Sequence, residues 1–193
     1  MVGLAGYGHR MGLFRRPRGW RRAQLPETAR ALLGLASGSR VLAWSPLVGG
    51  GWAVATPARL CALLPTGALI DRPWTDVDHV SWDAASGMLA VWWVGTRAAT
   101  PLEVAPDSFV PEVVYERVRA SLVAARDVPM PGGRSVWVAL RKADDGTLST
   151  QAVPGRGVRL ADPQVAALVA QARAALRDDV GLPPEAGPAT NHR

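Results

Sequence analysis

Short apolar segments separated by turn residues dominate the middle of the chain, residues 41–104. Within residues 77–82, apolar and polar side chains alternate with a period of two, as in a half-buried antiparallel strand. The run Gly49-Gly50-Gly51 can supply the positive φ angles of a hairpin turn. The pattern predicts about seven closely spaced strands in an antiparallel barrel or sandwich. The expected strands are residues 41–44, 52–56, 59–64, 69–70, 77–82, 88–94 and 100–104.

Helical patterns flank these strands. Pro26 and Glu27 suit a first helical turn and predict a short helix over residues 27–35. A second helix is predicted over residues 108–126, and it must bury its apolar stripe against the preceding sheet. That stripe consists of Val110, Val113, Val114, Val118 and Leu122.

A further group of elements follows residue 128. Strands are expected at 136–140 and 148–153, joined by the turn signal Asp144-Asp145-Gly146. Asp162 and Pro163 then form an N-cap followed by proline, which predicts a helix to about residue 180.

The expected fold class is α+β, with four segments along the chain. We expect residues 1–24 to be a disordered Arg-rich arm and residues 183–193 to be a disordered tail. Residues 25–127 hold the short helix, the seven-stranded barrel and its capping helix. Residues 128–182 form an extension made of a β-hairpin and a helix.

The charge of this chain is unevenly distributed. Among 193 residues there are 22 basic and 16 acidic side chains, a formal net charge of +6. The Arg-rich arm contains six arginines and no acid, so the remainder of the chain is electrically neutral. The single Cys excludes a disulfide framework and a Cys-rich zinc site.

The Arg-rich arm has three open interpretations. It could lie on an anionic membrane, it could contact nucleic-acid phosphates, or it could be a solvated tail without a partner. Translation could begin at Met1 or at Met11, and the sequence around Met11 favours the second. The candidate contact residues are Arg15, Arg16, Arg18, Arg21, Arg22, Phe14 and Trp20.

The sequence contains neither a membrane-spanning segment nor a secretion signal, and we therefore expect a cytoplasmic protein. No apolar run approaches the roughly 18–20 residues that a membrane-spanning helix needs. The arginines of the arm are followed by Ala23-Gln24-Leu25-Pro26-Glu27, which is not the apolar core of a secretion signal.

Candidate chemistry is sparse. Asp76, Asp78 and His79 are the best acid–base cluster, but strand periodicity places the two carboxylates on one face and the imidazole on the other. Cys61 lies in an apolar strand and is expected to be a buried structural thiol. The chain lacks nucleophile-elbow, phosphate-loop and dinucleotide motifs, so we expect no catalytic site, cofactor or metal.

Eight tryptophans raise the question of an aromatic binding surface. Most lie in or beside expected strands and are expected to pack in the core. Trp92 and Trp93 are adjacent, so one of them must face away from the first sheet surface. It either meets the C-terminal extension or is an exposed binding aromatic.

A family resemblance covers residues 38–126. Three phrases carry it: Gly38-Ser39-Arg40-Val41-Leu42-Ala43-Trp44, then Ala55-Thr56-Pro57-Ala58-Arg59-Leu60, then Arg72-Pro73-Trp74-Thr75-Asp76-Val77. In this order, followed by hairpins and a closing helix, they resemble the bacterial pleckstrin-homology-like (PH-like) domains. The whole chain also resembles a group of actinobacterial proteins.

The resemblance implies a strongly bent, seven-stranded antiparallel barrel capped at one end by the helix 108–126. It implies that Leu60 and Trp74 are core residues and that Arg59 pairs with an acid. Lipid-binding members carry basic residues in the first hairpin loop. Here that loop, residues 46–51, has none, so headgroup binding is not implied at that position.

The sequence therefore favours a cytoplasmic, non-enzymatic PH-like module that binds an unknown protein partner. The alternative is a peripheral membrane or nucleic-acid adaptor that acts through the Arg-rich arm. An enzyme whose site the sequence does not reveal is the third possibility.

Overall fold

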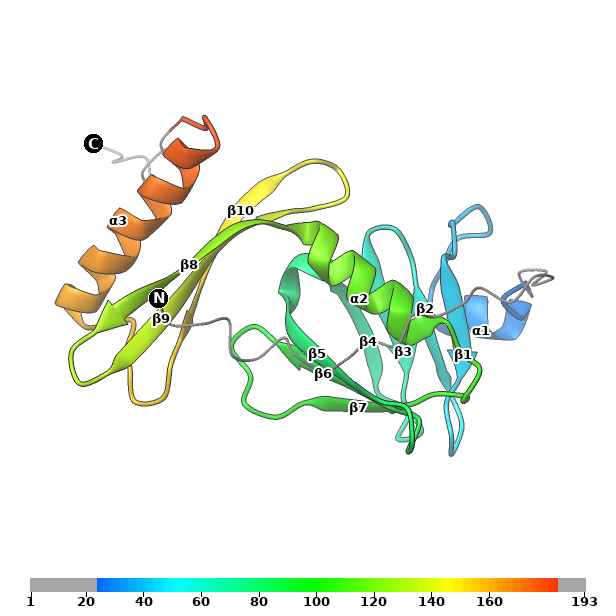
Figure 1. The fold of residues 1–193 in the computed structure, drawn as a ribbon. Helices are drawn as coiled ribbons and strands as arrows, with labels where there is room; N and C mark the ends of the chain where they lie inside the picture. Colours follow the sequence, from blue (N-terminus) through cyan, green and yellow to red (C-terminus); the bar gives the residue numbers. More distant parts are fainter. Residues whose placement is uncertain (1–23, 184–193) are drawn as a thin grey trace, which may run out of the picture.

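The computed structural model describes residues 24–183 of the chain. These residues form an α+β fold with three antiparallel sheets and a helix at the C-terminal end (Figure 1). None of the helices in this described part is long and apolar enough to cross a membrane. The Arg-rich arm up to residue 23, the Met11 start and the tail from residue 184 lie outside the described residues.

The first two sheets contain the seven strands expected from the sequence. The first sheet has the order β1 (Ala43–Pro46), β2 (Trp52–Ala55), β3 (Arg59–Leu63) and β4 (Leu69–Pro73). The 3₁₀ turn η1 (Trp74–Asp76) leads into the second sheet, which has the order β5 (Val77–Asp83), β6 (Met88–Trp93) and β7 (Thr100–Glu103). We call these two sheets together the seven-stranded body.

The two sheets do not close into the expected barrel. Strands β4 and β5 belong to different sheets, because Pro73 and the η1 turn redirect the chain between them. On the other side, an isolated bridge between Leu47 and Val104 connects the ends of β1 and β7. The seven-stranded body is therefore two sheets around one core.

That core lies between the two sheets and α2 (Val110–Ser121), which packs against β1, β2, β5 and η1. Leu60 is fully buried and Trp74 is 4% exposed, as the family resemblance implied. The Nε1 atom of Trp74 donates hydrogen bonds to the carbonyl oxygens of Thr56 and Pro57, both at 3.0 Å. The indole thus fixes the β2–β3 turn from the core side.

The outer face of the first sheet is covered by a second, smaller core. Helix α1 (Glu27–Leu32) is shorter than the predicted 27–35 and packs Leu25, Ala29 and Leu33 against Val54 and Cys61. The middle strands β2 and β3 are therefore buried on both faces, which accounts for their nearly continuous apolar character.

The C-terminal unit differs from the expected hairpin and helix. Its sheet has three strands, β8 (Leu122–Met130), β9 (Arg134–Lys142) and β10 (Leu148–Pro154), in the order β10-β9-β8. Helix α3 (Pro163–Asp179) packs on β8 and β9, close to its predicted bounds. The Asp162 side chain caps α3 by accepting a hydrogen bond from the Gln164 amide at 2.9 Å.

The prediction that α2 continues to residue 126 was wrong. The helix ends at Ser121, and the chain passes at once into β8, so the expected boundary after residue 127 falls within a strand. Arg141 of β9 explains the ending. Its Nη1 atom donates to the Val118 carbonyl at 3.3 Å and to the Ser121 hydroxyl at 2.9 Å. A cation at this place satisfies a carbonyl group of the last helical turn, that of Val118.

Arg141 also fastens the C-terminal unit to the seven-stranded body. Its side chain is 1% exposed, and Nη2 donates to the carbonyl oxygens of Val77 at 3.0 Å and Asp78 at 3.4 Å. Nearby, the Gln151 side chain of β10 donates to the carbonyl of Thr75. One arginine therefore joins β9, the end of α2 and the start of β5.

The turn between β1 and β2 allows a direct test of how closely the first sheet is packed. Gly51 has φ +91°, and a Cβ atom there would lie 2.0 Å from the Leu63 carbonyl oxygen. We expect Gly51→Ala to lower the free energy of unfolding in urea by about 4 kcal/mol or more, because the backbone of β3 must move.

Gly50→Ala is the matched control, since Gly50 has φ +106° but open space around its Cβ position. We expect that variant to lose only about 1–2 kcal/mol, from the left-handed backbone alone. Equal losses for both variants would contradict the close packing of this turn against β3.

Candidate functional site

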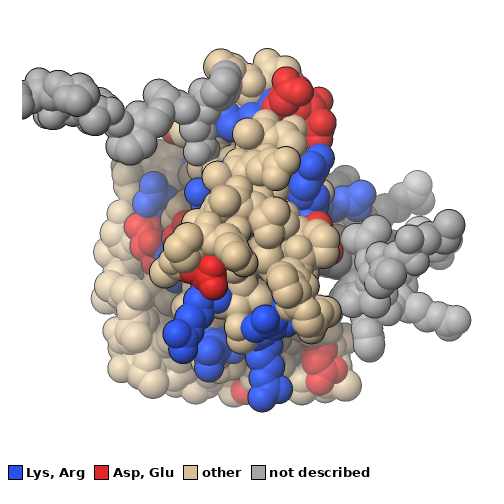
Figure 2. Space-filling view, turned by 90° about the vertical axis from the view of Figure 1, so that its left-hand side faces the viewer, with Lys and Arg blue, Asp and Glu red and all other residues tan. Residues whose placement is uncertain are grey.

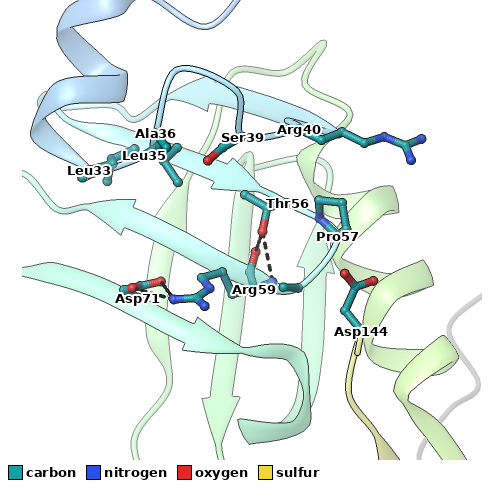
Figure 3. A pocket seen from close by; sticks show the side chains of 12 residues that line it. Leu33, Leu35, Ala36, Ser39, Arg40, Thr56, Pro57, Arg59, Asp71 and Asp144 are labelled. Carbon is teal, nitrogen blue, oxygen red and sulfur yellow. Dashed lines mark hydrogen bonds and ion pairs between the residues drawn. The ribbon is translucent and has the colours of Figure 1, made fainter. Parts of the chain in front are cut away.

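A groove of about 400 Å³ lies where the loop after α1, the β2–β3 turn, β4 and the β9–β10 turn meet (Figure 3). One wall is the loop after α1, a second is the β2–β3 turn, and Asp144 of the β9–β10 turn stands at one end. The lining residues are Leu33, Gly34, Leu35, Ala36, Ser39, Arg40, Thr56, Pro57, Ala58, Arg59, Asp71 and Asp144.

The β2–β3 turn is held by a compact set of hydrogen bonds. The Thr56 hydroxyl donates to the Arg59 carbonyl at 2.9 Å and accepts from the Arg59 amide at 3.0 Å, while the Thr56 amide also donates to the Arg59 carbonyl. Trp74 binds the same turn from the core side. This wall of the groove is thus pre-formed.

The opposite wall is held by Arg30 of α1. Its Nη1 atom donates to the carbonyl oxygens of Ala36 at 2.8 Å and Ser39 at 3.3 Å. These bonds tie the loop after α1 to the helix that precedes it. Backbone hydrogen bonds within the loop, such as that from the Ser39 amide to the Ala36 carbonyl, add to this constraint.

The third side depends on the C-terminal unit. Asp144 precedes a tight turn in which Gly146 has φ +87° and the Asp145 carboxylate accepts a hydrogen bond from the Thr147 amide at 2.8 Å. That bond holds the pKa of Asp145 below its ordinary value. Because Arg141 anchors the same strand three residues earlier, the docking of β9 brings Asp144 to the groove.

The groove carries two cations and two anions on walls that are about equally polar and apolar. The Arg59 guanidinium pairs with the Asp71 carboxylate at 3.0 Å, and both side chains are about half exposed, at 50% and 54%. Arg40 extends outward from its rim (Figure 3). An exposed ion pair contributes little to the free energy of folding, so Arg59 and Asp71 can bind a ligand instead of each other with little loss of stability.

Cys61 behaves as expected for a structural thiol. It is 1% exposed, and its Sγ lies 3.4 Å from the nearer Asp71 carboxylate oxygen. Burial, together with the charge of Asp71 and its hydrogen bond, raises the pKa of the thiol to about 12, although Arg59 acts in the opposite direction. A thiol held in the protonated form is a poor nucleophile.

The geometry of Asp76, Asp78 and His79 differs in part from the prediction. Asp76 pairs with Arg72 at 3.0 Å and lies apart from the other two. Asp78 and His79 do not face opposite sides, because their carboxylate and imidazole lie 3.0 Å apart. The pairing of β5 with β6 shifts register between Val77 and His79, and this bulge breaks the alternation of side chains.

No group of three or more His, Cys, Asp or Glu side chains in residues 24–183 could hold a metal ion.

Of the adjacent tryptophans, Trp93 is buried, and its Nε1 donates to the Thr100 hydroxyl. Trp92 faces the other way and stacks on the His79 ring, with centroids 4.4 Å apart.

The seven candidate residues of the Arg-rich arm all lie outside the described residues. Sequence reasoning missed the groove, although it singled out Arg59 as one half of an ion pair. No local pattern marks Arg40 or Asp144, since they meet only after β9 has docked. The turn signal at residues 144–146 predicted a turn at Asp144 but not the segments that this turn would meet.

Comparison with known proteins adds no relative: no family model, curated protein or solved structure matches this chain. The candidate site therefore depends on its own geometry.

Cys61 gives a test of the packing beneath the groove. We expect the native protein to resist iodoacetamide between about pH 8 and 10, because the thiol is buried and stays protonated there. The chain unfolded in urea should react readily, and faster as the pH approaches 9.0, the ordinary pKa. Rapid labelling of the native thiol, measured by mass spectrometry, would rule out the buried position.

Proposed function

We propose that this chain is a non-enzymatic protein-interaction module of PH-like architecture, and that its groove receives a segment of a partner protein. The observation that carries the proposal is the groove itself, which is lined by four segments of the chain and has two walls fixed by hydrogen bonds. A cytoplasmic location fits this role and is part of the proposal.

Three features support the PH-like assignment. Strands of the seven-stranded body are arranged as four followed by three, and α2 packs across both sheets. Leu60 and Trp74 occupy the core positions that the resemblance assigns to them. Arg59 has the acidic partner, Asp71, that the resemblance requires.

The lining of the groove suits a peptide segment. Leu33, Leu35 and Pro57 offer apolar contact, while Arg40 and Asp144 offer charges of opposite sign. A segment with an apolar side chain between an acidic and a basic one would complement this arrangement. Since Arg59 and Asp71 are already paired and half exposed, they can exchange partners without leaving a buried charge.

Filling the groove tests this proposal. We expect Ala58→Trp to abolish partner capture by the full chain, because the indole occupies the space between the walls. A photoreactive phenylalanine at exposed Ala36, on the rim, would cross-link whatever enters. Mass spectrometry of the cross-linked products should show at least a tenfold loss of partner in the variant.

Ala84→Trp is the matched control, since it adds the same indole to an exposed turn between β5 and β6. Its cross-links should equal those of the wild-type chain. Products that are identical in all three proteins, or no product above background, would argue against partner binding in this groove.

The alternative function, a peripheral membrane or nucleic-acid adaptor, depends on the six unbalanced arginines of the Arg-rich arm. Deletion of residues 11–24 should then abolish salt-dependent binding to anionic vesicles and to RNA. If binding is the same with and without these residues, the arm does not act as an adaptor.

A further inference from the structure

The free end of the C-terminal sheet carries a cluster that we call the basic tip: Arg134, Arg156, Arg159 and Leu160. Two turns form it, the β8–β9 turn and the loop after β10, which project side by side away from the seven-stranded body (Figure 1). The Gly155 amide donates to the Ser135 carbonyl at 2.9 Å, and the Arg134 Nη1 atom donates to the Gly157 carbonyl at 2.9 Å.

These two turns can approach so closely because of glycine. A Cβ atom at Gly155 would lie 2.6 Å from the Ser135 carbonyl oxygen. The Arg134 side chain is further held by its Nε donating to the Pro131 carbonyl at 3.1 Å. The two turns of the basic tip are therefore held together by specific hydrogen bonds and close backbone packing.

The charge of the basic tip is one-sided. Neither turn segment, 131–135 or 155–161, contains an acidic residue, and Arg134, Arg156 and Arg159 are all exposed. The nearest following acid is Asp162, which caps α3, so the three arginines of the tip still outnumber this one carboxylate. Figure 2 looks onto this end of the molecule and shows basic side chains on its lower part, with uncharged surface between them and a few acidic side chains beside them.

An apolar side chain stands within this cluster. Leu160 is 38% exposed and directly follows Arg159. Apolar residues flanked by arginines are typical of surfaces that enter the headgroup region of a membrane. A nucleic-acid site would favour a basic groove with stacking aromatic rings. The basic tip is a projecting end, and its two turn segments contain no aromatic residue.

We propose that the basic tip docks on the surface of a membrane rich in anionic lipids. Arg156 and Arg159 contact lipid phosphates, with Arg134 beside them, and Leu160 inserts between the headgroups. This surface shares no residue with the groove or with the Arg-rich arm, so the chain could hold a protein partner in the groove while it lies on the membrane.

Vesicle co-sedimentation of the full chain tests the proposal, with the arm intact in every variant. The probe is phosphatidylcholine vesicles containing about 30% phosphatidylserine, compared with vesicles of phosphatidylcholine alone. We expect binding to the anionic vesicles only, and about 30-fold weaker binding for the double variant Arg156→Gln/Arg159→Gln. Leu160→Asp should weaken binding as well, because it places a charge where the leucine inserts.

The matched control is Arg97→Gln/Arg119→Gln, which removes the same charge from exposed positions outside the tip. That control should keep most of the wild-type binding. The proposal is overturned if the tip and control variants bind vesicles equally. It is also overturned if the tip variants lose affinity for a single-stranded RNA oligonucleotide while their vesicle binding is unchanged.

Discussion

The arrangement of this protein depends on one buried cation, Arg141. Its guanidinium reaches from β9 to the last turn of α2 and to the first residues of β5, where its acceptors are neutral oxygens of Val118, Ser121, Val77 and Asp78. A charged donor buried among oriented carbonyls is stabilised, and each such bond is worth about 1.5–3 kcal/mol. Removing it would take this donor from the carbonyls of Val77 and Asp78, whereas the Val118 carbonyl would keep its hydrogen bond from the Ser121 hydroxyl.

Both proposed binding surfaces follow from this docking. The β9–β10 turn, which supplies Asp144 to the groove, begins after Lys142, the residue that follows Arg141, while the opposite ends of the same sheet form the basic tip. Once β9 is fixed against α2 and β5, the groove is complete on one side and the tip points away from the seven-stranded body (Figure 1). A single interaction thus sets the geometry of two surfaces that share no residue.

Local patterns predicted much of the fold. Alternation and turn residues located seven strands, and the Asp162-Pro163 signal located α3. The end of α2 could not be found in this way, because Arg141 lies twenty residues beyond Ser121 in the chain. Leu122, Ala124, Val128 and Met130 do alternate as a strand, but Leu122 also continues the helical stripe. Likewise, only pairing with β6 reveals the bulge that brings Asp78 to His79, and the groove exists only where distant segments meet.

Hydrogen–deuterium exchange of Arg141→Met, compared with the wild-type chain and with Arg119→Met on the exposed face of α2, tests the central claim most directly. Methionine keeps an unbranched apolar stem but loses all donors to α2 and β5. We expect faster exchange at the end of α2, at the start of β5 and in the β9–β10 turn, with β2 and β3 unchanged and Arg119→Met like the wild type. Exchange that is unaltered in these three segments would contradict the claim that Arg141 holds the C-terminal unit in place.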